Sequence, residues 1–243
     1  MKNLRRILFT AAASALFLSS CEDAYDIVQD GELNESAAFQ SVDDIALFLN
    51  GVYGQASNTN AIGFTAVITD EAGIGSQSGG QNVDLYKYVL DNNDGFANGI
   101  WLGNYSLINY SNRLLRGAAR VTPDPADEAY YNSMLAEARV LRAFGHLQLL
   151  TYFSTDMKDD NALGVILMDR VPATDEDLPR NTNGEVFALI ESDLAFADTY
   201  LQDRAGVTAY KYVTKNMVNA MRARMYAYRG NYPLAEQYAD QAL

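Results

Sequence analysis

Cys21 is the residue of this chain with the clearest chemistry of its own. It is the only cysteine in the sequence, so it cannot form a disulfide within the chain. It ends the stretch Leu-Ser-Ser-Cys and is followed at once by Glu22 and Asp23. This context fits a lipobox, in which the cysteine thiol is acylated and becomes the first residue of the mature protein. We predict lipidation at Cys21; the alternative is an ordinary secretory signal with an incidental cysteine.

The segment before Cys21 has the layout of a targeting sequence. Lys2, Arg5 and Arg6 form a positive start, and an apolar run of 12 residues extends from Ile7 to Leu18. A helix that spans a bilayer needs about 20 apolar residues, so this run is too short for one. We predict a lipoprotein signal peptide at 1–20 and an acidic, lipidated tether at 21–38. The attached lipid would then hold the protein on a membrane without a transmembrane helix.

The other residue types that commonly do catalysis are scarce or isolated. His146 is the only histidine, lies among apolar residues and is better explained as a core histidine. Zinc sites rich in His and Cys–His catalytic pairs are therefore excluded within this chain. No G-x-S-x-G, Walker A or G-x-G-x-x-G sequence occurs. We predict no catalytic residue, no metal site and no cofactor.

Acidic residues are numerous, and two readings of them stay open. A carboxylate pair for glycoside hydrolysis is not excluded by their number, but no acid and nucleophile can be named, which disfavours a lipid-anchored glycosidase. The stretch DNNDG at 91–95 has some character of a calcium loop but lacks the closing glutamate of an EF-hand. The net charge of −13 becomes −16 without the three basic residues of 1–20, and such a surface repels nucleic acid.

Helices must position whatever the chain binds, because helical periodicity covers most of the sequence. We expect helices over 41–57, 100–120, 125–153 and 183–203, followed by a pair that Gly230 separates. Thr182 and Glu185 form a T-x-x-E capping box. The other expected signals are N-caps at Ser41, Asp124 and Thr214, and a proline that opens the last helix at Pro233.

Residues 58–99 have a different composition, rich in Gly, Asn, Asp and Ser with scattered aromatics. We predict a long loop here, since such composition in a compact domain marks functional or irregular segments. Tyr86 and Phe96 are our candidates for substrate binding, as exposed rings that could stack on a sugar or peptide. The alternative is that these rings only pin the loop to the core.

The last two expected helices have the small/aromatic spacing of a tetratricopeptide hairpin, carried by Ala223, Tyr226, Gly230, Tyr232 and Ala235. One such hairpin cannot bury its own face and must stack on other helices. The predicted fold is mostly all-α, with tetratricopeptide-like helical repeats and long irregular loops. The sequence stops within a helical pattern, so we expect a truncated domain that leaves Leu234, Tyr238 and Leu243 exposed.

Several motifs, in collinear order, resemble the SusD/RagB family of outer-membrane nutrient-uptake lipoproteins of Bacteroidetes. The segment FQSVDDIALFLNGVYGQ resembles the first helix of the family, and RNTNGEVFALIESDLAFADTYL a later block. Two further motifs resemble W-x-x-x-Y-x-x-I-x-x-x-N, through Trp101, Tyr105, Ile108 and Asn112, and E-A-R-x-L-R-A, through Glu137, Ala138, Arg139, Leu141, Arg142 and Ala143. The chain departs from the family at Phe144-Gly145-His146, where bulkier aromatics are usual, and in its shorter length.

The resemblance implies a SusD-like N-terminal domain over 39–243 and a binding protein rather than an enzyme. Members sit on the outer face of the outer membrane, capture oligosaccharides and deliver them to a TonB-dependent SusC-like transporter. Glu22 and Asp23 resemble the export signal that sends such lipoproteins to the cell surface. Two alternatives remain: a RagB-like protein that takes up peptides, and a tetratricopeptide-type scaffold lipoprotein that holds a protein partner.

Overall fold

Helices form nearly all the regular structure in the computed structural model, which describes residues 38–69 and 71–243. The predicted signal peptide, Cys21 and nearly all of the tether lie outside the described residues. A single isolated β-bridge joins Leu163 to Thr182. The helices are α2 (Val42–Gln55), α3 (Thr59–Ile68), α4 (Val83–Tyr86), α5 (Gly95–Ala118), α6 (Glu128–Phe153), α7 (Asn183–Tyr200), the 3₁₀ turn η1 (Ala209–Lys211), α8 (Lys215–Tyr228) and α9 (Tyr232–Ala242).

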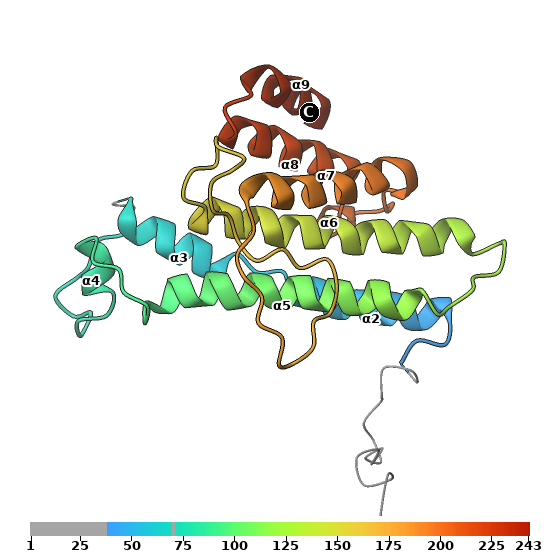
Figure 1. The fold of residues 1–243 in the computed structure, drawn as a ribbon, viewed down its shortest axis with the longest axis horizontal. Helices are drawn as coiled ribbons and strands as arrows, with labels where there is room; N and C mark the ends of the chain where they lie inside the picture. The colour runs from blue at the N-terminus through green and yellow to red at the C-terminus, as the bar shows by residue number, and fades with distance from the viewer. Residues whose placement is uncertain (1–37, 70) are drawn as a thin grey trace, which may run out of the picture. The chain divides into compact units, whose positions relative to one another are not determined.

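The long helices from α5 to α9 stack in chain order, and each packs against the next (Figure 1). Helix α2 lies along α5 and also contacts α6, while α3 packs on α5. The loop between α6 and α7 crosses over α5 (Figure 1). This arrangement confirms the expected all-α fold of stacked helices with long irregular loops. None of the described helices is both long and apolar enough to cross a membrane.

Most of the capping signals predicted from the sequence are present in the structure. Ser41 and Thr182 each close a full capping box, with Asp44 and Glu185 as the respective partners. Thr214 accepts a hydrogen bond from the Met217 N–H at the start of α8. Gly230 follows α8 with φ of 76°, a left-handed conformation that suits glycine. Pro233 occupies the first turn of α9, as expected.

The predicted cap at Asp124 is wrong. Helix α6 begins at Glu128, with Asp127 at its N-cap position. The backbone carbonyl of Asp124 instead accepts a hydrogen bond of 2.9 Å from the Asp127 N–H. The chain therefore makes a turn across Pro125 before the helix starts, which moves the first helical residue downstream.

Glycine allows α5 and α6 to approach each other closely. A Cβ atom added at Gly145 would lie 2.9 Å from Cγ1 of Ile108 and 3.3 Å from the Asn104 carbonyl oxygen. The glycine at position 145 therefore permits the close approach of the two helices. Ile108 and Gly145 are both buried, so this contact lies within the core.

A buried ion pair joins α6 to α7. Asp193 is fully buried and accepts hydrogen bonds of 2.8 Å and 2.6 Å from Nε and Nη2 of Arg142. Arg142 Nη1 also donates to Oδ1 of Asn112 on α5, at 2.7 Å. Three helices thus share one satisfied polar network, which is the condition under which a buried charge is tolerated.

The prediction of one long loop over 58–99 is wrong in part, because α3 and α4 lie within it. Helix α3 has the sequence TNAIGFTAVI, which lacks a polar stripe and so shows no amphipathic period. It is held by tertiary contacts instead: the Phe96 ring lies where a Cβ of Gly63 would be, and the Asn60 amide lies where a Cβ of Gly99 would be. Packing therefore makes a helix where local signals predict a loop.

The terminal hairpin is partly covered by its own aromatic rings. The rings of Tyr226 on α8 and Tyr238 on α9 stack with 5.7 Å between centroids. Leu234 and Tyr238 are half-buried rather than exposed, which corrects the expectation for these two residues. Leu243 is fully exposed, as expected. For Tyr238 the stacking on Tyr226 explains the difference, because each ring covers part of the other.

Candidate functional site

A hollow of about 520 Å³ lies between α5 and the α6–α7 loop, and we call it the α5 hollow. Helix α5 contributes one face, in which Trp101, Tyr105 and Asn109 are spaced by four residues. The remaining wall comes from the loop. The volume falls in the range of sites for small ligands. The full lining is Trp101, Leu102, Tyr105, Ser106, Asn109, Ile166, Met168, Glu176, Asp177 and Leu178.

Aromatic rings hold the inner wall of the α5 hollow rigidly. The Trp101 ring meets the rings of Tyr105 and Phe153 edge-on, with centroids 4.9 Å and 5.0 Å away. The Tyr105 hydroxyl donates to the Ile166 carbonyl at 3.1 Å and accepts from the Ile166 N–H at 2.8 Å. Burial raises the pKa of Tyr105 well above its usual value, so the phenol remains protonated. Leu102 adds an apolar side chain that is 67% exposed.

Side chains of α5 and α6 fix the loop that forms the outer wall. Asn112 donates to the carbonyls of Met168 and Arg170, and Arg142 donates to that of Asp169. The Met168 N–H donates to Nε2 of His146 at 3.1 Å. Because Nε2 accepts, the Nδ1 atom carries the proton and donates to the Arg142 carbonyl at 3.0 Å. His146 is fully buried, and each of its two ring nitrogens makes a hydrogen bond, which confirms its interpretation as a core histidine.

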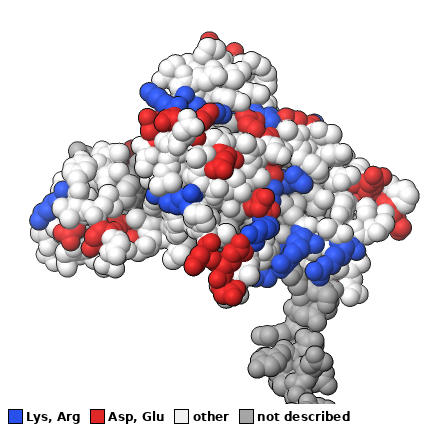
Figure 2. All heavy atoms as spheres, in the orientation of Figure 1, with Lys and Arg blue, Asp and Glu red and all other residues white. Residues whose placement is uncertain are grey.

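The acidic side chains at the rim of the α5 hollow differ in whether another residue already pairs with them. Glu176 pairs with Arg170 and also accepts from the Ala173 N–H. Asp177 is exposed, and no residue in the described part of the chain donates to it. Figure 2 shows acidic atoms gathered on this loop beside basic atoms along α5. The exposed basic residues at the end of α5 are Arg113, Arg116 and Arg120. An open carboxylate beside a rigid aromatic wall can accept hydroxyl or amide donors.

The two predicted substrate-binding rings lie outside the α5 hollow. Tyr86 is on α4 and is 39% exposed. Phe96 lies in the first turn of α5 and is half-buried against Gly63 of α3, so it packs the helices together. Among the described residues, these two rings form no aromatic pair with each other. A second hollow, of about 300 Å³, lies beside α4 and is lined by polar and apolar residues of 80–95.

The carboxylates of DNNDG have local structural roles. Asp91 accepts a hydrogen bond from the Asn93 N–H at 2.8 Å, and Asp94 caps α5 by accepting from the Ala97 N–H at 2.7 Å. Among residues 38–69 and 71–243, no group of three His, Cys, Asp or Glu side chains is placed to hold a metal ion. The sequence could have revealed the cap, because Asp94 precedes an apolar helical pattern.

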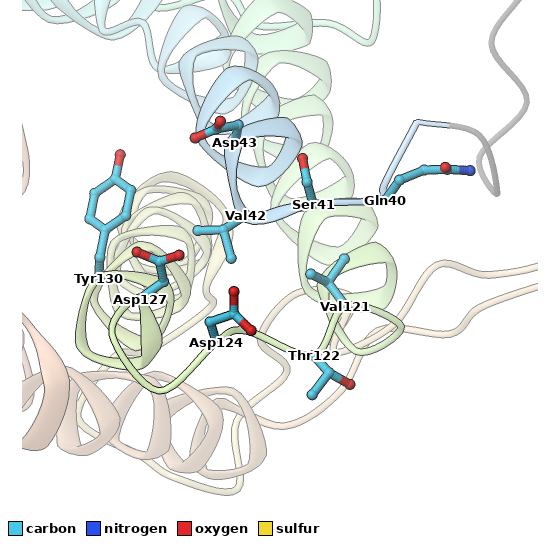
Figure 3. Close-up of a pocket in the computed structure, with 9 residues that line it drawn as sticks. All are labelled: Gln40, Ser41, Val42, Asp43, Val121, Thr122, Asp124, Asp127 and Tyr130. Atoms are coloured by element: carbon cyan, nitrogen blue, oxygen red, sulfur yellow. The ribbon is translucent and has the colours of Figure 1, made fainter.

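A third hollow, of about 390 Å³, lies at the start of α2 near the α5–α6 turn. Figure 3 shows Asp43, Asp124 and Asp127 around it, with the Tyr130 ring at one side. Its walls are mostly polar, and it lacks the fixed aromatic wall of the α5 hollow. We therefore regard the α5 hollow as the better candidate site, because small-ligand sites combine apolar walls with a few placed polar groups.

Comparison with known proteins gives one family. The profile of SusD-like proteins described as "Starch-binding associating with outer membrane" matches residues 25–227. The chain belongs to the SusD-like family. A SusD-like protein of Bacteroides ovatus is 23% identical over 249 residues, which is 96% of this chain and 43% of that protein.

Solved structures share the fold of this SusD-like chain. A putative sugar binding protein from Bacteroides vulgatus matches with a TM-score of 0.70 and 23% identity over 84% of this chain and 46% of that one. A laminarin binding SusD-like protein matches with a TM-score of 0.64 and 18% identity, over 84% and 44% respectively. The chain thus spans less than half the length of these relatives.

The motif residues of this SusD-like chain serve mainly to build its frame. Trp101 and Tyr105 line the α5 hollow, whereas Asn112 and Arg142 are buried and hold the loop. Sequence reasoning identified these residues as a family motif but missed the hollow that they position. The signal was present in the i, i+4 spacing of two aromatics and an amide on α5, at Trp101, Tyr105 and Asn109.

Proposed function

We propose that this chain is the helical-repeat part of a surface lipoprotein that captures oligosaccharides and delivers them to a TonB-dependent SusC-like transporter. Membership of the SusD-like family supports it, as do relatives named for sugar and laminarin binding. The observation that carries the proposal is the α5 hollow, where a fixed Trp101–Tyr105 wall lies beside the open Asp177 carboxylate. Aromatic faces suit the C–H faces of sugar rings, and carboxylates accept sugar hydroxyls.

Titration calorimetry of the purified full-length chain against neutral oligosaccharides and a peptide pool tests this proposal. Leu102→Ala removes an exposed apolar contact at the α5 hollow and should weaken oligosaccharide binding roughly fivefold or more. Leu47→Ala is the matched control, because Leu47 is 70% exposed on α2 and lines none of the hollows described above. Asp177→Asn should weaken binding about tenfold, whereas Asp175→Asn should not. Binding of peptides alone would favour the RagB-like alternative.

The lipid anchor is part of the same proposal. Its support is the Leu-Ser-Ser-Cys sequence that ends at Cys21, followed by Glu22 and Asp23. Acylation at Cys21 would place the protein on the outer membrane, facing the exterior. The variant Cys21→Ala should then appear in the soluble fraction. If it still fractionates with the outer membrane, the assignment of the anchor is wrong.

Association with a transporter is tested separately. A pull-down with the full-length chain as bait, from cells of the source organism, should retain an outer-membrane barrel protein. The scaffold alternative predicts that a protein partner is retained while neither sugars nor peptides bind. The two outcomes differ in the calorimetry, so one set of samples distinguishes them.

A further inference from the structure

A groove between α3, α6 and α8 contains an arginine that no acidic side chain pairs with. The groove has a volume of about 370 Å³, and we call it the Arg224 groove. Its lining includes Ile62, Gln148, Tyr152, Arg224 and Tyr228, with Glu71 at the rim. It shares no residue with the α5 hollow, so it is a separate site.

Most other arginines that are buried or half-buried in the described residues pair with an acid. Arg180 is an exception, because it donates to the backbone carbonyls of Gly164 and Phe153. Arg224, by contrast, pairs with no acidic side chain, although acidic residues outnumber basic residues in the chain. The pairs are Arg139 and Arg142 with Asp193, Arg204 with Glu137, Arg222 with Glu191 and Asp198, and Arg229 with Asp160.

Neutral groups hold the Arg224 side chain in position without balancing its charge. Its Nη2 atom donates to Oε1 of Gln148 and, at 3.4 Å, to Oγ1 of Thr151. Gln148 is held in turn, since its Nε2 donates to Oδ1 of Asn58 at 2.9 Å. Arg224 Nε is shielded from solvent with no hydrogen-bond partner, and Nη1 donates to no described residue. A fixed guanidinium with spare donors is prepared for an anionic partner.

The surroundings of Arg224 define the shape and polarity of that partner. The guanidinium carbon lies 5.6 Å from the centroid of the Tyr228 ring, and Tyr228 is 39% exposed. The Tyr152 ring is fixed edge-on to Phe64, and its hydroxyl lies 3.3 Å from that of Thr65. Tyr152 and Tyr228 both line the groove together with Arg224, so two aromatic rings belong to the same hollow as the charge.

We propose that the Arg224 groove binds the carboxylate of an acidic sugar, a uronate unit of an oligosaccharide. Arg224 pairs with the carboxylate, and the tyrosine rings contact the sugar ring. The inference rests on the proposed function in taking a saccharide as ligand, but it assigns a second site and a charged class of sugar. Glu71 is exposed at the rim and repels a carboxylate, so it opposes the effect of Arg224.

Calorimetry of the full-length chain with an oligouronate, and with the same oligosaccharide methyl-esterified, tests the inference. Arg224→Gln should weaken binding of the oligouronate about 10- to 100-fold and leave binding of the ester unchanged. Glu71→Gln should tighten binding of the oligouronate about two- to fivefold, because a like charge is removed. Arg120→Gln is the matched control, since Arg120 is exposed at the end of α5 and lines none of the hollows described above.

Three outcomes overturn the inference: equal binding of oligouronate and ester, no effect of either variant, or binding of an acidic peptide in place of the oligouronate. If Arg224→Gln fails to fold, Glu71→Gln and Arg224→Lys decide, because lysine keeps the charge but loses the planar fork. Arg224→Lys should bind the oligouronate more weakly than the unaltered chain. Binding of neutral oligosaccharides at the α5 hollow is measured in parallel, so failure of the proposed function is seen separately.

Discussion

His146 provides a test of how the core supports the α5 hollow, through the pH dependence of stability. Burial lowers the pKa of this histidine from about 6.5 to about 4, with a smaller lowering from the charge of Arg142. Its neutral Nε2 atom accepts the Met168 N–H that positions the outer wall. Protonation would destroy this acceptor and place a second charge beside Arg142. The folded chain therefore keeps His146 neutral at pH values where the unfolded chain binds a proton.

The sign and the size of the effect follow from this difference. Between pH 6.5 and 4 the unfolded state binds more protons, so the free energy of unfolding falls as the pH falls. A pKa difference of about 2.5 corresponds to roughly 3 kcal/mol, since one pKa unit is about 1.4 kcal/mol. The contribution is complete above pH 6.5 and is lost progressively down to about pH 4. Such a loss is a large fraction of the stability of an ordinary domain.

Urea denaturation of the full-length chain and of His146→Gln, from pH 4 to pH 8, measures the effect. The glutamine Oε1 atom can still accept the Met168 N–H but does not titrate. Because Asp193 and Glu137 titrate in both proteins, the difference between the two curves isolates His146. We expect the unaltered chain to lose about 3 kcal/mol more than the variant between pH 6.5 and 4.

Parallel curves for the two proteins would refute this reasoning. A direct check is available, because the sequence contains one histidine and its imidazole signal in an NMR titration is unambiguous. A ring that titrates near pH 6.5 in the folded chain would mean that His146 is not buried as described. Retention of a neutral ring down to about pH 4 would support it.

Two further changes test the frame around the site. Asp193→Ala leaves Arg142 buried without its counterion and should lower the free energy of unfolding by about 3–5 kcal/mol. Glu176→Ala breaks only the exposed pair with Arg170 and should change the free energy of unfolding far less; urea denaturation measures both variants. Gly145→Val forces a side chain into Ile108 and should cost about 1–3 kcal/mol or more, seen as a lower thermal midpoint, while Gly103→Val, where a Cβ meets nothing within 4 Å, should show only the small effect of helix propensity.

Much of the helical frame could be predicted from the sequence because its signals are local. A capping box at Thr182 or a glycine at Gly230 depends on a few neighbouring residues and on backbone geometry. Prediction from the sequence fails where contacts between residues far apart in the chain decide the local structure. The short helix α3 forms because it packs on α5, with Gly63 against Phe96 and Asn60 against Gly99. The periodicity of its sequence does not predict these contacts.

The candidate site was harder to predict because half of its wall has no regular structure. Ile166 and Met168 belong to a loop whose backbone is bonded by side chains of α5 and α6. A sequence pattern predicts the face of a helix but not which loop covers it. The rings chosen from composition, Tyr86 and Phe96, are not among the α5 hollow residues, and Phe96 packs instead on Gly63.

Some of the residues that carry the family resemblance build the frame of the protein and do not line the α5 hollow. Asn112 and Arg142 carry the resemblance, and both are buried with their polar atoms engaged by Met168, Asp169, Arg170 or Asp193. Changing them would collapse the wall, whatever ligand is bound. The side chains that remain open in the α5 hollow, Leu102 and Asp177, make no such contacts to the frame and can change without loss of the fold. A shared fold at 18–23% identity is therefore compatible with different ligands, and the choice of ligand must be measured at these open positions.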